Sequence, residues 1–319
     1  MKTGAIVRQG RAAMVAVLMA GACWSGAAGP GAAQNLAPAA VLSGYTQAIA
    51  EAAAADPALA AFYAARGYQP IWTSGVDAPR RAAFFGALDA APAQGLPAAR
   101  YGADDLREKF ASIRSERERG LLEVAVSRAF LAYAHDVSNG VLEPKKVDAG
   151  LVREVPRRDP GALITAFSLT DTPARYLRDL APKSPQYAWL VKARLEIATQ
   201  IAAGGWGEPV HAKSLRPGDE GPAVIALRDR LQAMGYLGRS ATARYDGAMQ
   251  KAVQDYQFDL GLKADGVADA TTLTELNRAP QERLRSILVA MERLRWMNGL
   301  DLGTRHIWVN ITDFSARVV

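Results

Sequence analysis

The stretch that decides the fold begins LRPGDEGPAVIALRDRLQAMGYLG at residues 215–238 and continues YDGAMQKAVQDYQFDLGLKADGVADATTLTELN at residues 245–277. Pro222 suits the first position of a helix, because the N–H that proline lacks would have no partner there. Apolar residues then repeat at helical spacing until Gly235, which can adopt the positive φ that ends a helix. The pattern predicts a helix that starts at Pro222 and stops at Gly235.

The second half of the stretch predicts two more helices. One begins at Asp246-Gly247 and ends at Gly261; after a turn at Asp265-Gly266, a short third helix carries Leu273 and Leu276. Three such helices form a bundle of under about 70 residues, which is small but able to fold. We expect its core to contain the apolar residues Val224, Leu227, Leu231, Tyr236, Val253 and Leu262.

Two motifs in this stretch carry a resemblance. Leu-Arg-x-Gly-Asp-x-Gly before a Val-x-x-Leu helix spans 215–227, and Ala-Val-x-x-aromatic-Gln-x-x-x-Gly-Leu-x-x-Asp-Gly-Val spans 252–267. Both are similar to the bacterial peptidoglycan-binding domain. The chain departs from the family where only Thr271 remains of a Gly-Pro-x-Thr segment, and where Arg228 replaces a Gln. The resemblance implies a wall-binding module over 214–279.

Polar groups between the helix ends are the candidates for contact with glycan strands or peptide stems of peptidoglycan. Carboxylates at helix starts are first of all caps. An aromatic ring beside amides and carboxylates can also hold a sugar face or an amino-acid stem, and we expect the ring of Tyr256 to be exposed. The candidate binding residues are Asp219, Asp246, Tyr256, Gln257, Asp265 and Thr271.

The composition bounds the class of protein. The chain has 319 residues, half of them apolar, which is enough for two domains with their own cores. The net charge of +6 fits either ordinary solubility or attraction to an anionic wall polymer. No run of Lys and Arg is interleaved with aromatic residues, so we expect no nucleic-acid partner.

The N-terminus has the pattern of a secretory signal peptide over residues 1–33, with three basic residues before an apolar run at 12–22. That run is too short to be a transmembrane segment. The only cysteine, Cys23, leaves with the signal unless Ala20-Gly21-Ala22-Cys23 is a lipoprotein site for an outer-membrane anchor, although Leu is missing at the key position. An exported chain without disulfides indicates the periplasm.

After a linker at 34–40, residues 41–203 predict a helical block. Gly67 and Pro70 break it between its second and third helices. Gly204-Gly205-Trp206-Gly207 ends the block and indicates a hinge over 204–213, and Trp72 and Trp206 are expected to be packed anchors. The predicted helices cover 41–55, 58–66, 79–91, 104–116, 121–137, 160–168, 173–180 and 185–202.

Several sequence motifs of this block carry a second resemblance. They are Phe62-Tyr63-x-x-Arg66-Gly67-Tyr68-Gln69-Pro70-x-Trp72, Gly95-Leu96-Pro97 with Tyr101, Ala129-Phe130-Leu131-x-Tyr133-Ala134-x-Asp136, Gly140-x-Leu142-x-Pro144-x-x-Val147-Asp148, and Ala174-Arg175-Tyr176-Leu177 before Pro182. They resemble the scaffold domain of the large murein L,D-transpeptidases, in which the scaffold precedes a peptidoglycan-binding module, as it does here.

The last part of the chain, 280–319, is similar to the start of that family's catalytic domain. An amphipathic helix over 281–297 resembles the helix that leads into it, and strands at 307–311 and 314–319, with a bend at Thr312-Asp313, resemble its first strands. A lone strand pair is marginal in water, so we expect a truncated or incompletely translated chain. The expected fold is mainly α: a helical scaffold, a three-helix bundle, then a helix and two strands of an incomplete β-sandwich.

L,D-transpeptidases use a histidine and the thiolate of a Ser-x-Gly-Cys segment to make 3–3 crosslinks through a thioester, which requires an activated nucleophile. No cysteine follows Cys23, so no residue is assigned a catalytic role. The resemblance implies the scaffold and wall-binding portion of a periplasmic L,D-transpeptidase, whose own catalytic domain is a missing partner. The alternative is a non-catalytic wall-binding or partner-recruiting periplasmic protein.

Other active sites have little support. His135, His211 and His306 lack metal-ligand spacing, so we expect no metal and no other cofactor. Asp104-Asp105, or Asp136 with Glu143, could form a glycosidase pair. The simpler interpretation makes Asp104 a helix cap and Asp136 a solvated residue.

Overall fold

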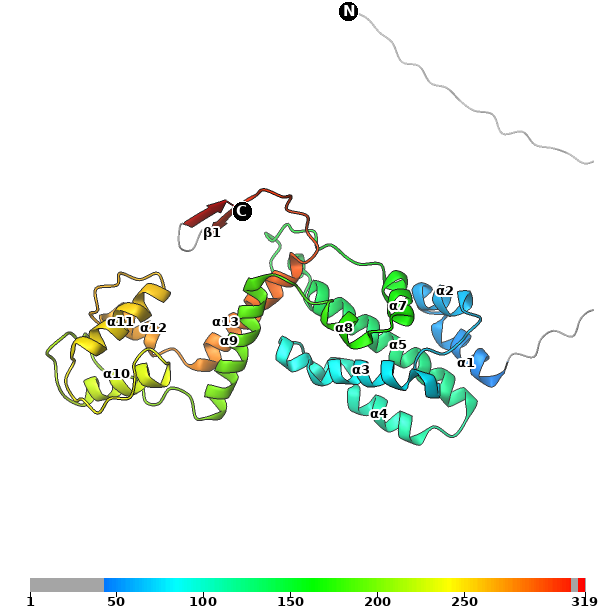
Figure 1. Ribbon diagram of the computed structural model, residues 1–319, viewed down its shortest axis with the longest axis horizontal. Helices are drawn as coiled ribbons and strands as arrows, with labels where there is room; N and C mark the ends of the chain where they lie inside the picture. The colour runs from blue at the N-terminus through cyan, green and yellow to red at the C-terminus, as the bar shows by residue number, and fades with distance from the viewer. Residues whose placement is uncertain (1–42, 311–314, 319) are drawn as a thin grey trace, which may run out of the picture. The chain divides into compact units, whose positions relative to one another are not determined.

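The computed structural model describes residues 43–310 and 315–318. The expected signal peptide, the linker, Cys23 and the bend at Thr312-Asp313 lie outside these residues. Within them the fold is mainly α, as expected: thirteen α-helices, three short 3-10 helices and one two-stranded sheet (Figure 1). No helix in the described part has the length and apolarity that a bilayer crossing requires.

Capping residues define where the first helices begin. The Ser43 side chain accepts a hydrogen bond from the Thr46 N–H, and the Asp56 carboxylate accepts from the amides of Ala58 and Leu59. The break after the second helix lies where it was expected, because Gly67 has a φ of +59° there. The helices and 3-10 turns before the central helix are α1 (Gly44–Ala53), α2 (Pro57–Ala65), η1 (Gly75–Asp77), α3 (Ala78–Asp89), η2 (Ala91–Gln94), η3 (Ala98–Tyr101) and α4 (Ala103–Ser112).

The central helix α5 (Glu116–Asn139) begins at a capping box, in which Ser115 and Glu118 each bond the other's backbone. Its buried face meets an aromatic cluster, in which the rings of Phe130 and Phe167 stack with their centroids 4.5 Å apart. Trp72 belongs to the same cluster and is fully buried, as its anchor role predicts. The helices after α5 are α6 (Pro144–Val147), α7 (Pro160–Leu169), α8 (Pro173–Arg178) and α9 (Pro185–Ala202).

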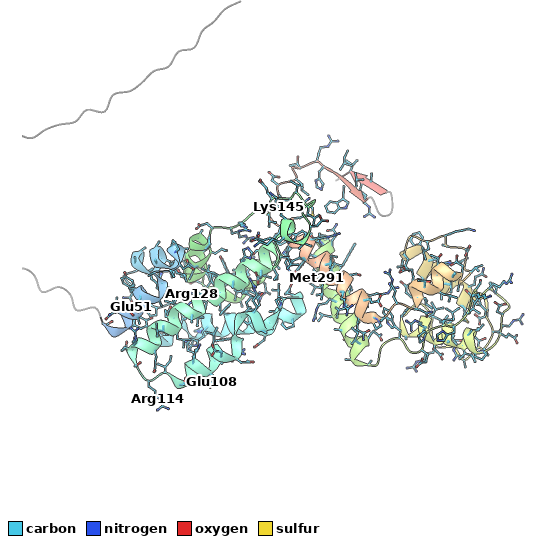
Figure 2. The ribbon with its side chains drawn as sticks, turned by 180° about the vertical axis from the view of Figure 1, so that it is seen from behind. Glu51, Glu108, Arg114, Arg128, Lys145 and Met291 are labelled. Carbon is cyan, nitrogen blue, oxygen red and sulfur yellow. The ribbon has the colours of Figure 1, made fainter. Side chains whose placement is uncertain are left out.

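Helix α13 (Pro280–Trp296) packs mainly against α9 and also against α5 (Figure 1). The two long helices are antiparallel, because Pro280 lies beside Gly205 just past the end of α9, whereas Arg295 reaches Tyr187 at its start. Met291 of α13 is fully buried next to Gly95 (Figure 2). The helix that sequence patterns place at the start of a catalytic domain thus packs on helices of the scaffold.

Residues 215–277 form the expected three-helix bundle between α9 and α13: α10 (Pro222–Ala233), α11 (Gly247–Asp259) and α12 (Ala270–Leu276). Gly235 has a φ of +85° and follows the end of α10, as expected. Backbone bonds in both directions between Leu215 and Ala268, 2.9 and 2.8 Å long, join the first segment to the loop before α12. The core contains Val224, Leu227, Leu231 and Val253, while Tyr236 and Leu262 are half-buried.

The only sheet of the described part pairs β1 (Ile307–Asn310) with β2 (Ser315–Val318) in antiparallel register, with Ile307 opposite Val318. The two strands expected at the C-terminal end are therefore present. Both are short, and the side chains of Ile307, Val309 and Val318 are exposed.

Two expectations about carboxylates are wrong. Asp104 does not cap α4: Gly102 holds the cap position and Asp104 lies in the first turn, with Arg107 as its partner. Asp136 is 1 % exposed rather than solvated. Its carboxylate forms an ion pair with Arg100 Nε at 2.7 Å and accepts a hydrogen bond from Tyr101 OH at 3.0 Å. Both partners come from η3 and are not apparent from the periodicity of α5.

Candidate functional site

Three of the predicted binding carboxylates lie around one buried residue of the module, Tyr245. The Tyr245 N–H donates to the backbone carbonyl of Asp219 at 2.8 Å, and Asp246 follows it directly in the chain. Burial raises the pKa of the Tyr245 phenol, and the charges of Asp265 and Asp219 raise it further. The sequence motifs had not singled out Tyr245, although its place directly before the cap of α11 is a usable signal.

Each of these carboxylates has a local structural role. Asp246 caps α11 by accepting from the Met249 N–H at 2.9 Å. Asp219 accepts from the Arg216 N–H and Asp265 from the Val267 N–H, both at 2.9 Å, so these two fix turns rather than helix starts. Asp219 and Asp246 are half-buried, and each keeps one carboxylate oxygen that bonds no described residue, whereas the second oxygen of the exposed Asp265 pairs with Lys263 Nζ at 3.3 Å.

Gln257 connects the loop before α12 to α11. Its side chain is 2 % exposed. The amide nitrogen donates to Val267 O at 2.9 Å and Thr272 Oγ1 at 3.1 Å, while the amide oxygen accepts from the Gly266 N–H at 2.9 Å. These bonds hold the loop against two helices. Thr271, the next predicted residue, is exposed on the first turn of α12 beside this network.

The expectation that the Tyr256 ring is exposed is wrong, since Tyr256 is 1 % exposed. Its ring packs edge-on against Tyr236 with the centroids 5.2 Å apart, and its hydroxyl accepts from Arg283 Nη2 at 2.6 Å. Arg283 belongs to α13, which lies outside residues 214–279, so the module's sequence motif could not predict that this arginine buries Tyr256. Tyr256 therefore contacts a different set of residues from the other five candidates.

The module should lose stability in acid through two of its carboxylates. The backbone N–H of Val267 lowers the pKa of Asp265, and that of Thr272 lowers the pKa of Asp269. A lowered folded-state pKa means that the stabilisation is present above the ordinary carboxyl pKa of about 4 and is lost as pH falls through the folded value. We expect the thermal midpoint to fall between about pH 5 and about pH 3.

The matched comparison is the double variant Asp265→Asn/Asp269→Asn. Asparagine still accepts the turn and cap hydrogen bonds but does not titrate. Thermal unfolding followed by circular dichroism should show a shallower pH dependence for this variant than for the unaltered chain. Equal slopes would contradict the role given to the two carboxylates.

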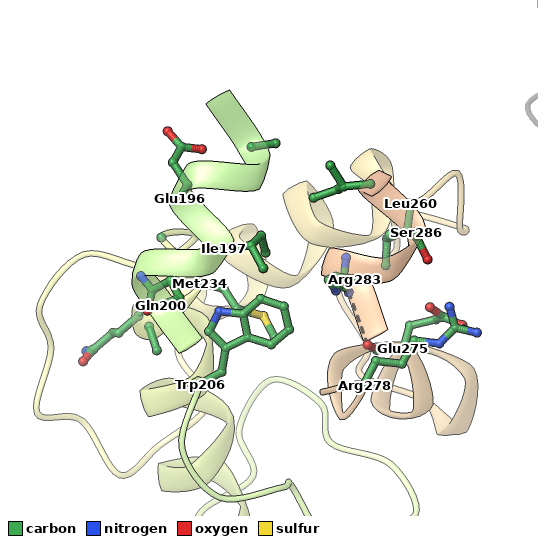
Figure 3. Close-up of a pocket in the computed structure, with 15 residues that line it drawn as sticks. Glu196, Ile197, Gln200, Trp206, Met234, Leu260, Glu275, Arg278, Arg283 and Ser286 are labelled. Atoms are coloured by element: carbon green, nitrogen blue, oxygen red, sulfur yellow. Dashed lines mark hydrogen bonds and ion pairs between the residues drawn. The ribbon is translucent and has the colours of Figure 1, made fainter. Parts of the chain in front are cut away.

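A cavity of about 740 Å³ lies where the module meets α9 and α13 (Figure 3). Glu196, Ile197 and Gln200 of α9 form one wall, and residues from the ends of α10, α11 and α12 form another. Sequence reasoning missed this cavity, because its walls come from segments far apart in the chain. Trp206, which was expected to be a packed anchor, is 5 % exposed and also lines it.

Arginine side chains link the cavity to its surroundings. Arg230 donates from Nε to Leu276 O at 2.7 Å and from Nη1 to Gly207 O at 2.9 Å, so it satisfies carbonyls at the end of α12 and in the linker after α9. Burial lowers the pKa of Arg230, and the nearby charge of Arg283 also lowers it. The Arg283 guanidinium lies 5.4 Å from the centroid of the Trp206 ring.

Among the described residues, no group of three or more His, Cys, Asp or Glu side chains is arranged to hold a metal ion. His135 is near a carboxylate, with Nδ1 3.2 Å from Asp136 Oδ1. The Asp136 carboxylate also forms an ion pair with Arg100. We therefore assign His135 and Asp136 a structural role on α5.

Comparison with known families agrees with both resemblances. A family model described as "Scaffold domain" matches residues 57–193, and one described as "Putative peptidoglycan binding domain" matches residues 220–276. No curated protein matches the chain significantly. The chain therefore carries a scaffold domain followed by a peptidoglycan-binding domain, an order consistent with a scaffold-bearing L,D-transpeptidase-like protein.

Proposed function

We propose that this protein binds peptidoglycan through residues 214–279 and serves as the scaffold and wall-binding portion of a periplasmic L,D-transpeptidase. The observation that carries the proposal is the three-helix module at 220–276, which matches the peptidoglycan-binding family and lies between the two long helices α9 and α13. A cell-wall role follows from that family. The transpeptidase role is supported by the scaffold domain that precedes the module.

The module offers the chemistry that a weak wall ligand needs. The carboxylate oxygens of Asp219 and Asp246 that bond no described residue can accept hydrogen bonds from sugar hydroxyls or from stem amides and ammonium groups. A ligand at Asp265 would compete with Lys263, which pairs with its second oxygen. Contacts of this kind give low affinity for one muropeptide. Retention on a polymeric wall would come from repeated encounters at high local ligand concentration.

The role assigned to the chain is positioning rather than bond making. A 3–3 crosslink requires a thiolate that attacks the stem and a base that activates it. The sequence has one cysteine, Cys23, within the expected signal peptide. The scaffold and module would hold a catalytic domain at the wall and so raise the local concentration of stems around it.

Sedimentation with purified sacculi tests the wall-binding part. We expect the full chain to pellet with intact sacculi at moderate salt, and to stay in solution after the sacculi are digested with muramidase. Gln257→Ala should pellet less, because the loop at 265–267 loses its hydrogen bonds at a cost of about 1–3 kcal/mol. Gln47→Ala, on the exposed side of α1, is the matched control and should behave like the unaltered chain. Protein that remains in the supernatant with intact sacculi would refute the proposal.

A second candidate function, a non-catalytic wall-binding or partner-recruiting protein, is favoured by the same single cysteine. One observation tests both candidates together, and a second separates them. Pure full-length chain incubated with tetrapeptide stems should give no covalent adduct by mass spectrometry under either candidate, and an adduct would contradict both. The gene beyond the codon for Val319 should encode a histidine and a Ser-x-Gly-Cys segment under the first candidate and neither under the second.

A further inference from the structure

We infer that the cavity between α9, α13 and the module binds the peptide stem of peptidoglycan, a short peptide that carries both carboxylate and ammonium groups, rather than the glycan strand. This inference rests on the proposed wall-binding function and names the part of the wall that is recognised. The cavity volume of about 740 Å³ falls in the range of sites that enclose small ligands.

The lining offers charges of both signs (Figure 3). Arg278 and Arg283 can bind stem carboxylates, and Glu196 and Glu275 can bind the ammonium group of a diamino acid. The pairings within the protein are long or incomplete: Arg278 Nη2 lies 3.4 Å from Glu275 Oε1, and Lys192 Nζ lies 3.7 Å from Glu196 Oε1. A ligand of mixed charge can therefore compete for these groups.

Arg283, which lines the cavity, has one hydrogen-bond donor without an acceptor in the described part of the chain. Its Nη2 donates to the Tyr256 hydroxyl and to Glu275 O, but its Nε is buried and has no partner among the described residues. A buried donor without an acceptor costs about 1–3 kcal/mol. A ligand in the cavity cannot reach this buried nitrogen, but the positive charge of Arg283 in the lining still attracts a carboxylate there.

The apolar part of the lining favours a peptide over a sugar. Ile197, Met234 and Leu260 present aliphatic groups that suit the methyl side chains of alanine residues in the stem. A sugar face would need an open aromatic ring, and the one aromatic residue of the lining, Trp206, is almost fully buried. The geometry thus lacks a stacking platform for a glycan.

The arginines of this region do not all serve one purpose. Arg230 uses Nε, Nη1 and Nη2 on backbone carbonyls of Leu276, Gly207 and Arg278, so it stabilises the module and is not assigned to the ligand. Arg278 and Glu196 are exposed enough to respond to a ligand, with 51 % and 63 % of their side chains accessible. They are the two residues whose replacement should disturb binding without unfolding the module.

The test measures binding of the synthetic tetrapeptide L-Ala–γ-D-Glu–diaminopimelate–D-Ala to the full chain by isothermal titration calorimetry. The variant Glu196→Gln/Arg278→Gln keeps the net charge and should bind the peptide at least about tenfold more weakly, as expected when charge-assisted hydrogen bonds are lost. The control Lys251→Gln/Asp255→Asn removes one charge of each sign from α11 and should bind as the unaltered chain does.

Sacculi provide the second arm. Sacculi stripped of stems by an amidase should retain less protein than intact ones if the cavity recognises stems. No measurable binding of the tetrapeptide, equal binding by both double variants, or equal retention on stripped sacculi would each overturn the inference. The proposed function would survive those results as long as intact sacculi still retain the protein, and it fails if they do not.

Discussion

Glu123→Ala is expected to destabilise the scaffold by at least about 3 kcal/mol. The Glu123 carboxylate is fully buried on α5 and accepts from three consecutive backbone amides, those of Ile71, Trp72 and Thr73, at 2.7 to 3.2 Å. Alanine would leave these three N–H groups buried without an acceptor, at about 1–3 kcal/mol each. The same carboxylate also accepts from the hydroxyls of Tyr63 and Thr73.

The segment that Glu123 holds explains the size of this effect. It follows the helix break at Gly67 and carries Trp72 into the aromatic cluster, so loss of its hydrogen bonds also loosens the core. Burial raises the pKa of Glu123, and the donated hydrogen bonds oppose that rise. Urea unfolding followed by tryptophan fluorescence measures the change. Glu123→Gln keeps one acceptor oxygen, so its urea midpoint should lie between those of the unaltered chain and Glu123→Ala. An unchanged midpoint for the alanine variant would contradict the role of the carboxylate.

Arg295→Leu is expected to destabilise the packing of α13 by about 3–5 kcal/mol, the usual cost of removing one partner of a buried ion pair. Arg295 is 1 % exposed and donates from Nη1 to Glu292 Oε2 at 3.1 Å and from Nη2 to the Tyr187 hydroxyl at 3.0 Å. It also donates to the carbonyl of Gln94. Leucine would leave Glu292 buried without its counter-charge.

The neighbouring contacts locate the effect at the end of α13. Glu292 accepts from the Leu142 N–H at 2.7 Å, and Trp296 Nε1 donates to Leu142 O at 3.0 Å, so this helix end is bonded to the loop after α5. Arg293→Gln removes a positive charge from an exposed site on the same helix and should change the urea midpoint little. Glu292→Gln combined with Arg295→Leu should recover part of the loss, and additive effects of the two substitutions would contradict the pairing.

The sequence alone predicts those features whose causes are local. Pro185 and Pro222 begin helices where expected, and Gly235 ends one, because proline and glycine restrict or free their own backbone. The periodicity of apolar residues also placed Val224, Leu227, Leu231 and Val253 correctly in the module core. Each of these signals depends only on a few residues that are neighbours in the sequence, so it can be recognised without knowledge of the fold.

Apart from the cap of α4, which lies at Gly102 rather than Asp104, the errors arise where distant segments meet. Tyr256 was expected to be exposed, but Arg283 and Tyr236 enclose it. Asp136 was expected to be solvated, but η3 covers it with Arg100. The cavity was missed for the same reason, because its walls come from segments far apart in the chain. Glu292 and Arg295 are only three residues apart on α13, but their burial depends on Leu142 and Tyr187, which no local pattern places beside them.

The proposed function requires the module at residues 214–279 to bind peptidoglycan. The most direct measurement is a titration of ¹⁵N-labelled full-length protein with soluble muropeptides, followed by amide and indole chemical shifts in NMR spectra. We expect concentration-dependent shifts for module residues and for the Trp206 indole N–H, with α1 to α8 unaffected. Absence of shifts at saturating ligand, or shifts confined to the scaffold helices, would contradict it.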